Sequence, residues 1–277
     1  MKELFSFGPI HIYFFGLMIA IAAISGGAFA IKQGEKRGIN EDIIFNLIII
    51  VVVSGVLGAR LFYIFFYDPS FYFSNPGEII KINEGGLSIH GGIFSAIVAG
   101  YVYSIKSKIS FFKLADIAVI GIALAQGIGR VGCDVFGKPM TNIMIWGISY
   151  NGQILHPAQV YEFILDYILF IILWRRSSKK KFEGELFVIY LIVFPIIRGI
   201  VEFFRINPVV WGPFSISHLL SLVLVIIGLV MYKLLSKRKT EEINTYAEEE
   251  KLKLTTSILY LVSLIVISIF TFYFVQG

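Results

Sequence analysis

The sequence contains very little cysteine and little charge. Its 277 residues include one cysteine, Cys133, so the chain can form neither an internal disulfide nor a Cys-x-x-Cys or cysteine–histidine metal cluster. Charged residues make up 16% of the chain, compared with about 25% in soluble domains. These shortages exclude a disulfide-rich secreted domain and an ordinary soluble enzyme.

Long hydrophobic runs are what the sequence has in excess. Hydrophobic residues make up 57% of the chain, and runs of about 20 such residues are long enough to cross a bilayer as helices. We therefore predict an all-α polytopic membrane protein with eight transmembrane helices. The predicted spans are 9–31, 43–66, 91–106, 112–133, 158–174, 184–204, 214–235 and 254–275.

Basic residues are concentrated in alternate loops. They follow the first, third, fifth and seventh spans. In that order, the four groups are Lys32, Lys36 and Arg37; Lys106, Lys108 and Lys113; Arg175, Arg176, Lys179, Lys180 and Lys181; and Lys237, Arg238 and Lys239. Loops rich in lysine and arginine remain in the cytoplasm. With eight spans, this pattern predicts that both termini lie on the outer side of the membrane.

Four arginines lie within or at the ends of the predicted spans: Arg60, Arg130, Arg198 and Arg205. Placing an arginine at the centre of a membrane helix costs roughly 2.5–3.5 kcal/mol, so the presence of four such arginines indicates that they have a function. The predicted topology places all four in the outer half of the bilayer. We therefore expect them to converge on an anionic ligand.

Spacing supports a pairing among these charges. Arg198, Glu202 and Arg205 are separated by four and three residues, which places them on one helix face. Glu202 can then pair with either arginine and lower the cost of burying it. A purely structural Arg–Glu–Arg ladder explains this spacing equally well.

Two histidines lie near the outer ends of predicted spans. His90, in EGGLSIHGG (84–92), is placed in the outer loop before the third span, where it is a candidate base and where Gly91 and Gly92 permit close approach of a head group. A structural role for a loop histidine is the alternative. In HPAQVYE (156–162), Pro157 suits a first helical turn, and His156 either caps the helix or contacts a ligand near Tyr161.

The run GIGRVG surrounds Arg130 with small residues. It contains the letters GxGxxG, but no strand precedes it and it lies in a membrane span, so a dinucleotide site is excluded. We expect the glycines to serve helix packing and to leave room for a ligand. Cys133 is expected to be a small apolar filler, and His218 has no special context.

Six dispersed segments together resemble the prolipoprotein diacylglyceryl transferase family. They are FSFGPIHIYFFGLM near the start, GARLFY (58–63), EGGLSIHGG, GIGRVG, HPAQVYE and RGIVEFFR (198–205), in the family's order over roughly residues 5–235. The resemblance implies seven core helices and an outward amino terminus. It predicts the family's membrane domain over residues 1–239 and a charged linker with an additional helix over 240–277.

The resemblance also implies a reaction. Members are bacterial inner-membrane enzymes that transfer the diacylglyceryl group of phosphatidylglycerol to the lipobox cysteine of a prolipoprotein and release glycerol 1-phosphate. His90, Arg130 and Arg198 fall on the family's functional positions, and no metal or cofactor is expected. The phosphatidylglycerol-binding residues expected here are Arg60, Gly91, Gly92, Arg130, His156, Tyr161, Arg198, Glu202 and Arg205.

Several family positions differ in this chain. A tryptophan and a tyrosine near the start are Phe14 and Phe15, before Gly16, and a tyrosine before the second arginine is Phe194. In the family pattern GRxGNxxNGE, the asparagines are Cys133 and Phe136 and the glutamate is Lys138. These changes leave open a paralogue that uses another acceptor, and a lipid-binding protein without activity.

Overall fold

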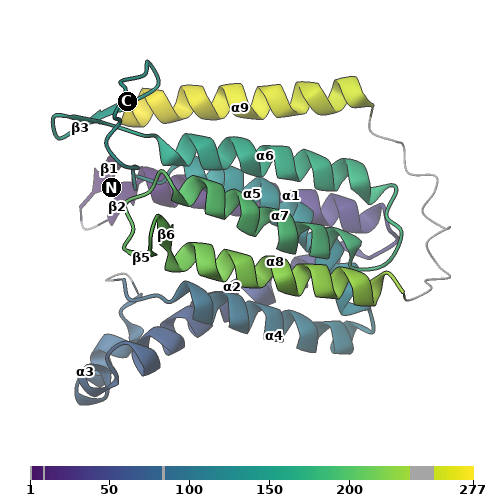
Figure 1. Cartoon of the computed structure of the whole chain (residues 1–277). Helices are drawn as coiled ribbons and strands as arrows, with labels where there is room; N and C mark the ends of the chain where they lie inside the picture. The colour runs from purple at the N-terminus through teal and green to yellow at the C-terminus, as the bar shows by residue number, and fades with distance from the viewer. Residues whose placement is uncertain (1, 9, 83–84, 238–252) are drawn as a thin grey trace. The chain divides into compact units, whose positions relative to one another are not determined.

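The computed structural model describes residues 2–8, 10–82, 85–237 and 253–277. Helices dominate the described chain, with three short two-stranded hairpins, so the all-α prediction is confirmed (Figure 1). The chain forms two compact units. Unit 1 comprises residues 1–30 and 115–277, and unit 2 comprises residues 31–114.

Unit 1 contains most of the helices and all three hairpins. Its elements are β1 (Glu3–Phe7), β2 (Ile10–Tyr13), most of α1 (Phe14–Glu35), most of α5 (Phe111–Val131), β3 (Ile148–Tyr150), β4 (Gln153–Leu155), α6 (Ala158–Ser177), α7 (Glu185–Glu202), β5 (Val209–Trp211), β6 (Phe214–Ser215), α8 (Ile216–Leu235) and α9 (Leu254–Gln276). Helix α6 packs against α7 and α9, and α7 packs against α8. Figure 1 shows α9, in yellow, lying along α6.

Unit 2 is built on one helix pair. It contains α2 (Glu41–Phe66), α3 (Pro69–Ser74), the 3-10 helix η1 (Pro76–Ile80) and α4 (Ile89–Ser107), and α2 packs along α4. The contact is close because small residues face each other: a Cβ on Gly58 would lie 1.9 Å from Ser95 Oγ, and one on Gly91 would lie 2.3 Å from Phe62 Cβ. Small residues at a helix contact allow this approach of backbones in a membrane.

The long helices follow the predicted apolar runs. Five of them, α1, α2, α5, α8 and α9, are long and apolar enough to cross a membrane. Helices α4, α6 and α7 also match predicted spans, but the total of seven core helices plus one stays a prediction. The division at residue 239 also stays a prediction, and most of the predicted charged linker lies at 238–252, outside the described residues.

Helix boundaries differ from the predicted ones by a few residues. The first run begins at residue 9, but residues 10–13 form β2 of the N-terminal hairpin and α1 begins only at Phe14. The third run begins at residue 91, but α4 begins at Ile89, because the Ser88 hydroxyl caps it by accepting from Gly91 N. The long loops also contain α3, η1 and the β3–β4 hairpin, which the hydrophobic pattern does not indicate.

Helix α6 is the centre of unit 1. Phe163, Tyr167, Leu169 and Leu173 are fully buried, and neighbours from α5, α7 and α9 cover them. A helix that is mostly enclosed is apolar around most of its circumference, so the polar residues that α6 buries are costly. Their positions therefore mark places where charge has a role.

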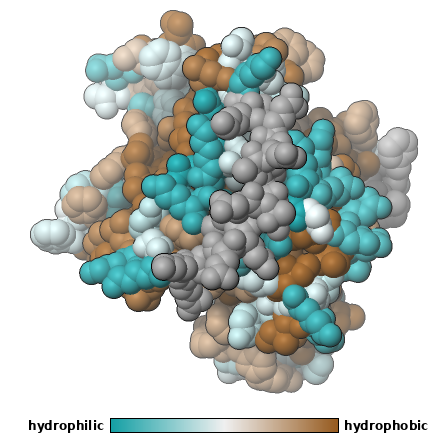
Figure 2. All heavy atoms as spheres, turned by 90° about the vertical axis from the view of Figure 1, so that its right-hand side faces the viewer, coloured by the Kyte–Doolittle hydropathy of each residue, from teal (hydrophilic) through white to brown (hydrophobic). Residues whose placement is uncertain are grey.

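The start of α7 is fixed from α5. Buried Asp116 accepts from the amides of Gly184 at 2.9 Å and Phe187 at 3.0 Å, and it lies 3.2 Å from Lys180 Nζ. These contacts satisfy amides that a helix start leaves without intrahelical partners. Figure 2 views the end at which α6 and α8 end and α9 begins, where hydrophilic side chains gather around the grey residues.

Candidate active site

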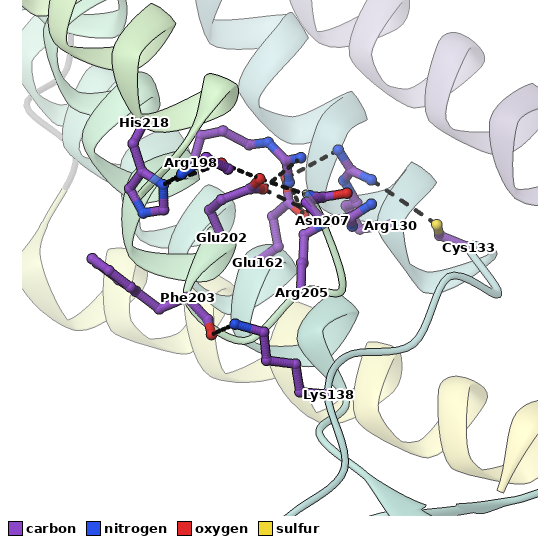
Figure 3. A network of polar contacts seen from close by, with 11 residues as sticks. Arg130, Cys133, Lys138, Glu162, Arg198, Glu202, Phe203, Arg205, Asn207 and His218 are labelled. Atoms are coloured by element: carbon purple, nitrogen blue, oxygen red, sulfur yellow. Dashed lines mark hydrogen bonds and ion pairs between the residues drawn. The ribbon is translucent and has the colours of Figure 1, made fainter. Parts of the chain in front are cut away.

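Charged side chains from three helices of unit 1 meet at one end of the helices. Arg130 lies in the last turn of α5, Glu162 in the second turn of α6, and Arg198 and Glu202 in the last turns of α7. Arg205 follows directly after α7. Figure 3 shows these five side chains pointing toward one another. The predicted convergence is confirmed for Arg130, Arg198 and Arg205.

Glu162 joins the two arginines that come from different helices. One of its carboxylate oxygens lies 3.0 Å from Arg130 Nη2, and the other lies 3.6 Å from Arg198 Nη1 (Figure 3). The Glu162 side chain is fully buried, whereas those of Arg130 and Arg198 are 31% and 22% exposed. The carboxylate thus neutralises one side of each guanidinium, and both arginine side chains stay partly exposed.

Glu202 organises the other half of the cluster. Its Oε2 lies 3.1 Å from Arg198 Nη2 and 4.0 Å from Arg205 Nε, so the predicted pairing along α7 is confirmed. Its Oε1 accepts from Asn207 Nδ2 and from Ser215 Oγ, each at 2.7 Å. Both carboxylate oxygens are therefore engaged, which fixes the orientation of Glu202.

The cluster holds more guanidiniums than carboxylates that form ion pairs with them. Three guanidiniums share two ion-paired carboxylates, those of Glu162 and Glu202. In the described part of the chain, Nε and Nη1 of Arg205 and Nη1 of Arg198 are buried without a hydrogen-bond partner. Burial lowers the pKa of the Arg205 guanidinium, and the nearby Arg198 lowers it further. An anion that accepts hydrogen bonds from these groups would relieve this crowding.

A second layer of polar contacts lies next to Glu162. The Tyr161 hydroxyl accepts from Trp146 Nε1 at 3.1 Å and lies 3.1 Å from His156 Nδ1. The rings of His156 and Tyr161 both pack against Phe204, just before Arg205. His156 provides no side-chain cap, since α6 has Pro157 at its N-cap position and begins at Ala158. Contact of His156 or Tyr161 with a ligand stays a prediction.

The glycines around Arg130 serve packing, as predicted. A Cβ on Gly127 would lie 2.3 Å from the Tyr167 ring, and one on Gly132 would lie 2.7 Å from Met18 Cβ. Cys133 is buried and its sulfur lies 4.0 Å from Arg130 Nη1. The backbone of α5 thus approaches its neighbours closely enough to fix the end that carries Arg130.

Arg60 has structural contacts within unit 2. It is 6% exposed, and it donates to the carbonyls of Glu78 (2.5 Å), Ile79 (3.0 Å), Gly85 (2.7 Å) and Gly86 (3.1 Å). Its guanidinium also lies over the Tyr72 ring. Arg60 thus holds the segment after α3 against α2, which favours a structural role over the head-group contact; its contact with a lipid stays a prediction.

His90 belongs to a helix rather than to a loop. It is the second residue of α4, exposed, and follows the Ser88 cap, whose amide donates to Ala59 O at 2.9 Å. Gly91 and Gly92 face α2, so close helix packing, and not open backbone for a ligand, accounts for them. The catalytic role of His90 stays a prediction.

Sequence reasoning missed several members of the network. It gave no role to Glu162, to Asn207 or to Ser215, and it found no context for His218, which closes a capping box with Ser215 at the start of α8. It also missed Asp166, buried one turn after Glu162 and without a hydrogen-bond partner in the described chain. The available signal was the presence of two acidic residues four apart in an apolar run.

The donor set suits an anion rather than a metal ion. The described residues contain no group of three or more histidine, cysteine, aspartate or glutamate side chains able to hold a metal. Guanidiniums provide planar pairs of N–H donors that match phosphate oxygens. The arrangement is therefore suited to binding and polarising a phosphate ester.

Known proteins match this chain over most of its length. The model of the prolipoprotein diacylglyceryl transferase family matches residues 2–234. A phosphatidylglycerol–prolipoprotein diacylglyceryl transferase of Clostridioides difficile is 36% identical over 243 residues, which cover 87% of this chain and 97% of the relative. Proteins of the same name from Finegoldia magna and Bacillus cereus are 34% and 33% identical, covering 82% and 80% of this chain and 92% and 87% of the relatives. The chain therefore belongs to the prolipoprotein diacylglyceryl transferase family.

Proposed function

We propose that this protein transfers the diacylglyceryl group of phosphatidylglycerol to the lipobox cysteine thiol of prolipoproteins and releases glycerol 1-phosphate. The observation that carries the proposal is the cluster of Arg130, Arg198 and Arg205 on two buried glutamates, which leaves cationic donors available to one phosphate. The names of the relatives agree with this substrate pair.

The reaction breaks one bond and makes one bond at a CH₂ carbon. The acceptor sulfur, as thiolate, attacks the diacylglyceryl carbon that is esterified to phosphate, and a thioether forms. The C–O bond breaks, and its electron pair stays on the departing glycerol phosphate. A base must accept the thiol proton, and exposed His90 is the proposed group.

Arginines account for most of the proposed rate enhancement. Phosphate esters react slowly at carbon, so stabilising the charge that grows on the leaving phosphate is the main task. Arg130 and Arg198 are the proposed clamp, because each is partly exposed and is paired with Glu162. Glu202 keeps Arg198 and Arg205 oriented. Tyr161 and His156 are proposed to contact the lipid from the adjoining layer.

The proposed location is the bacterial cytoplasmic membrane, with the site toward the outer leaflet. In unit 1, the basic residues Arg175, Arg176 and Lys179–Lys181 follow the end of α6 that is opposite to Glu162. Basic loops remain in the cytoplasm, so the end with the cluster faces outward. Phosphatidylglycerol in that leaflet and a prolipoprotein crossing the membrane then meet at the cluster.

The test is reconstituted transfer. Purified protein with phosphatidylglycerol and a lipobox peptide is expected to yield lipidated peptide and glycerol phosphate in equal amounts. Arg130→Ala is expected to lose nearly all turnover, whereas Arg175→Ala, at the opposite end of unit 1, is expected to retain it. The proposal fails if the wild-type protein gives no product under conditions in which a relative such as the Clostridioides difficile protein is active.

A different acceptor is the second candidate, because two family positions have other roles here. The Phe136 ring packs against Tyr150, and Lys138 Nζ donates to Phe203 O at 3.2 Å, so these side chains support the loop and carry no amide toward a ligand. Lipid and lipoprotein analysis of a deletion strain separates the two. Loss of a non-protein lipid with lipoproteins intact would favour this candidate, and phosphatidylglycerol binding without turnover would indicate a non-catalytic protein.

A further inference from the structure

Helix α9 is part of the packed core of unit 1, although it lies beyond the family match, which ends at residue 234. Phe272 is fully buried against α6, and Ser268 Oγ lies 2.7 Å from the Tyr167 hydroxyl. Several other α9 side chains, among them Ile258, Val266 and Phe270, are exposed and apolar, as expected for a helix that faces lipid on its outer side. Lipid contact alone does not require the polar contacts at its carboxyl end.

Three hydrogen bonds tie the end of α9 to other segments. The Tyr273 hydroxyl donates to Trp146 O at 2.5 Å, and Gln276 Nε2 donates to Val131 O at 3.0 Å. Lys2 Nζ donates to Val275 O. Val131 follows Arg130 directly, and Trp146 lies in the loop between α5 and α6.

These contacts continue into the cluster of arginines. Trp146, whose carbonyl accepts from Tyr273, donates its indole N–H to the Tyr161 hydroxyl at 3.1 Å. Tyr161 precedes Glu162 in α6 and contacts His156 through the same hydroxyl. The end of α9 thus connects to Arg130 through Val131, and to Glu162 through Trp146 and Tyr161.

We propose that α9 is a positioning element for the arginine cluster, with Tyr273 and Gln276 as its positioning residues. Tyr273 fixes the loop that carries Trp146, which in turn sets the place of Tyr161 and His156 beside Glu162. Gln276 holds the end of α5 where Arg130 projects. The expected effect of α9 on turnover rests on the proposed function, whereas its expected effect on the loop that carries Trp146 does not.

The test compares two substitutions of the same kind on one helix. Tyr273→Phe removes the hydroxyl and keeps the ring contact with Phe272. Tyr260→Phe removes a hydroxyl from the other end of α9, where the Tyr260 ring packs on Trp174, and is the matched control. We expect Tyr273→Phe to lower kcat about 3- to 10-fold, in keeping with a lost hydrogen bond of about 1 kcal/mol, with a smaller change in KM for phosphatidylglycerol.

Hydrogen exchange gives a readout that does not depend on activity. Amides of residues 143–150 are expected to exchange several-fold faster in Tyr273→Phe than in Tyr260→Phe. The double variant Trp146→Phe with Tyr273→Phe is expected to lower kcat no further than whichever of its two single substitutions lowers kcat more. Equal exchange and equal kcat in the two tyrosine variants would overturn the inference, even where Arg130→Ala abolishes turnover. Absence of turnover in the wild type would defeat the proposed function alone, because the exchange comparison still decides the role of α9.

Discussion

Glu162 lies 3.0 Å from Arg130, although the two residues come from different helices and a hairpin-containing loop separates them in the sequence. The same carboxylate also reaches Arg198, so one buried acid holds two arginines from two helices. This arrangement makes Glu162 the residue on which the geometry of both guanidiniums depends.

Replacing Glu162 is therefore expected to disturb both arginines. Glu162→Gln keeps the size of the side chain and removes its charge, so we expect transfer to fall at least 10-fold and the midpoint of thermal unfolding in detergent to decrease. The loss of stability should be smaller than the roughly 3–5 kcal/mol of a fully buried pair, because both arginines are partly exposed. Glu183→Gln, in the loop before α7, is the control. Wild-type turnover in Glu162→Gln would remove the acid from the mechanism.

Arg60 is expected to act on the loop and not on the lipid. Arg60→Lys keeps one positive charge but provides fewer donors for four carbonyls, so we expect faster hydrogen exchange at residues 76–82. Phosphatidylglycerol binding to the variant, measured in nanodiscs, should equal that of the wild type. A clear loss of lipid affinity with unchanged exchange would favour the head-group contact instead.

Close packing in unit 2 predicts a difference between two glycines. Gly58→Ala places a Cβ 1.9 Å from Ser95 Oγ, so α2 and α4 must move apart, at a cost of about 1–3 kcal/mol. Gly77→Ala meets no atom within 4 Å and should change the unfolding midpoint little. Equal midpoints for the two variants would contradict the helix contact described here.

Asp116 is expected to be needed for the start of α7. Asp116→Asn removes the charge that pairs with Lys180 and weakens acceptance from the amides of Gly184 and Phe187. We expect a loss of about 1–3 kcal/mol in the free energy of unfolding, since hydrogen bonds to charged groups are the stronger ones. Lys179→Gln, in the same loop, serves as a control for net charge. The prediction is wrong if both variants unfold like the wild type.

The sequence predicted the long helices better than the segments between them. Apolar runs determine where helices such as α2 and α8 lie, because a long apolar segment in a membrane must pair its own backbone groups and does so as a helix. The short hairpins depend on a few turn residues, such as Gly8 and Gly152 with positive φ, and have no comparable pattern. His90 was misplaced for the same reason, since the Ser88 cap is one local hydrogen bond.

Prediction of the site succeeded for three arginines and their partner Glu202, and gave no role to Glu162. The cost of a guanidinium in an apolar run singled out Arg130, Arg198 and Arg205, and helix alternation brought them to one end. The sequence placed Glu162 at the same end as the arginines but gave it no role, because that role depends on contacts across three helices, which no spacing within α6 reveals. The contacts of Arg60 could not be predicted for the same reason, because the carbonyls that surround it belong to a segment that folds back on α2.

The contact of α9 with Val131 and Trp146 has a consequence for synthesis of the protein. Chains grow at about 5–20 residues per second, so α9 emerges several seconds after α7 has supplied Arg198 and Glu202. During that interval, the surface of α6 that Phe272 later covers and the Trp146 carbonyl lack their partners. Lys2 can donate to Val275 only after residue 275 has been made, so this contact forms after those among the helices that precede α9.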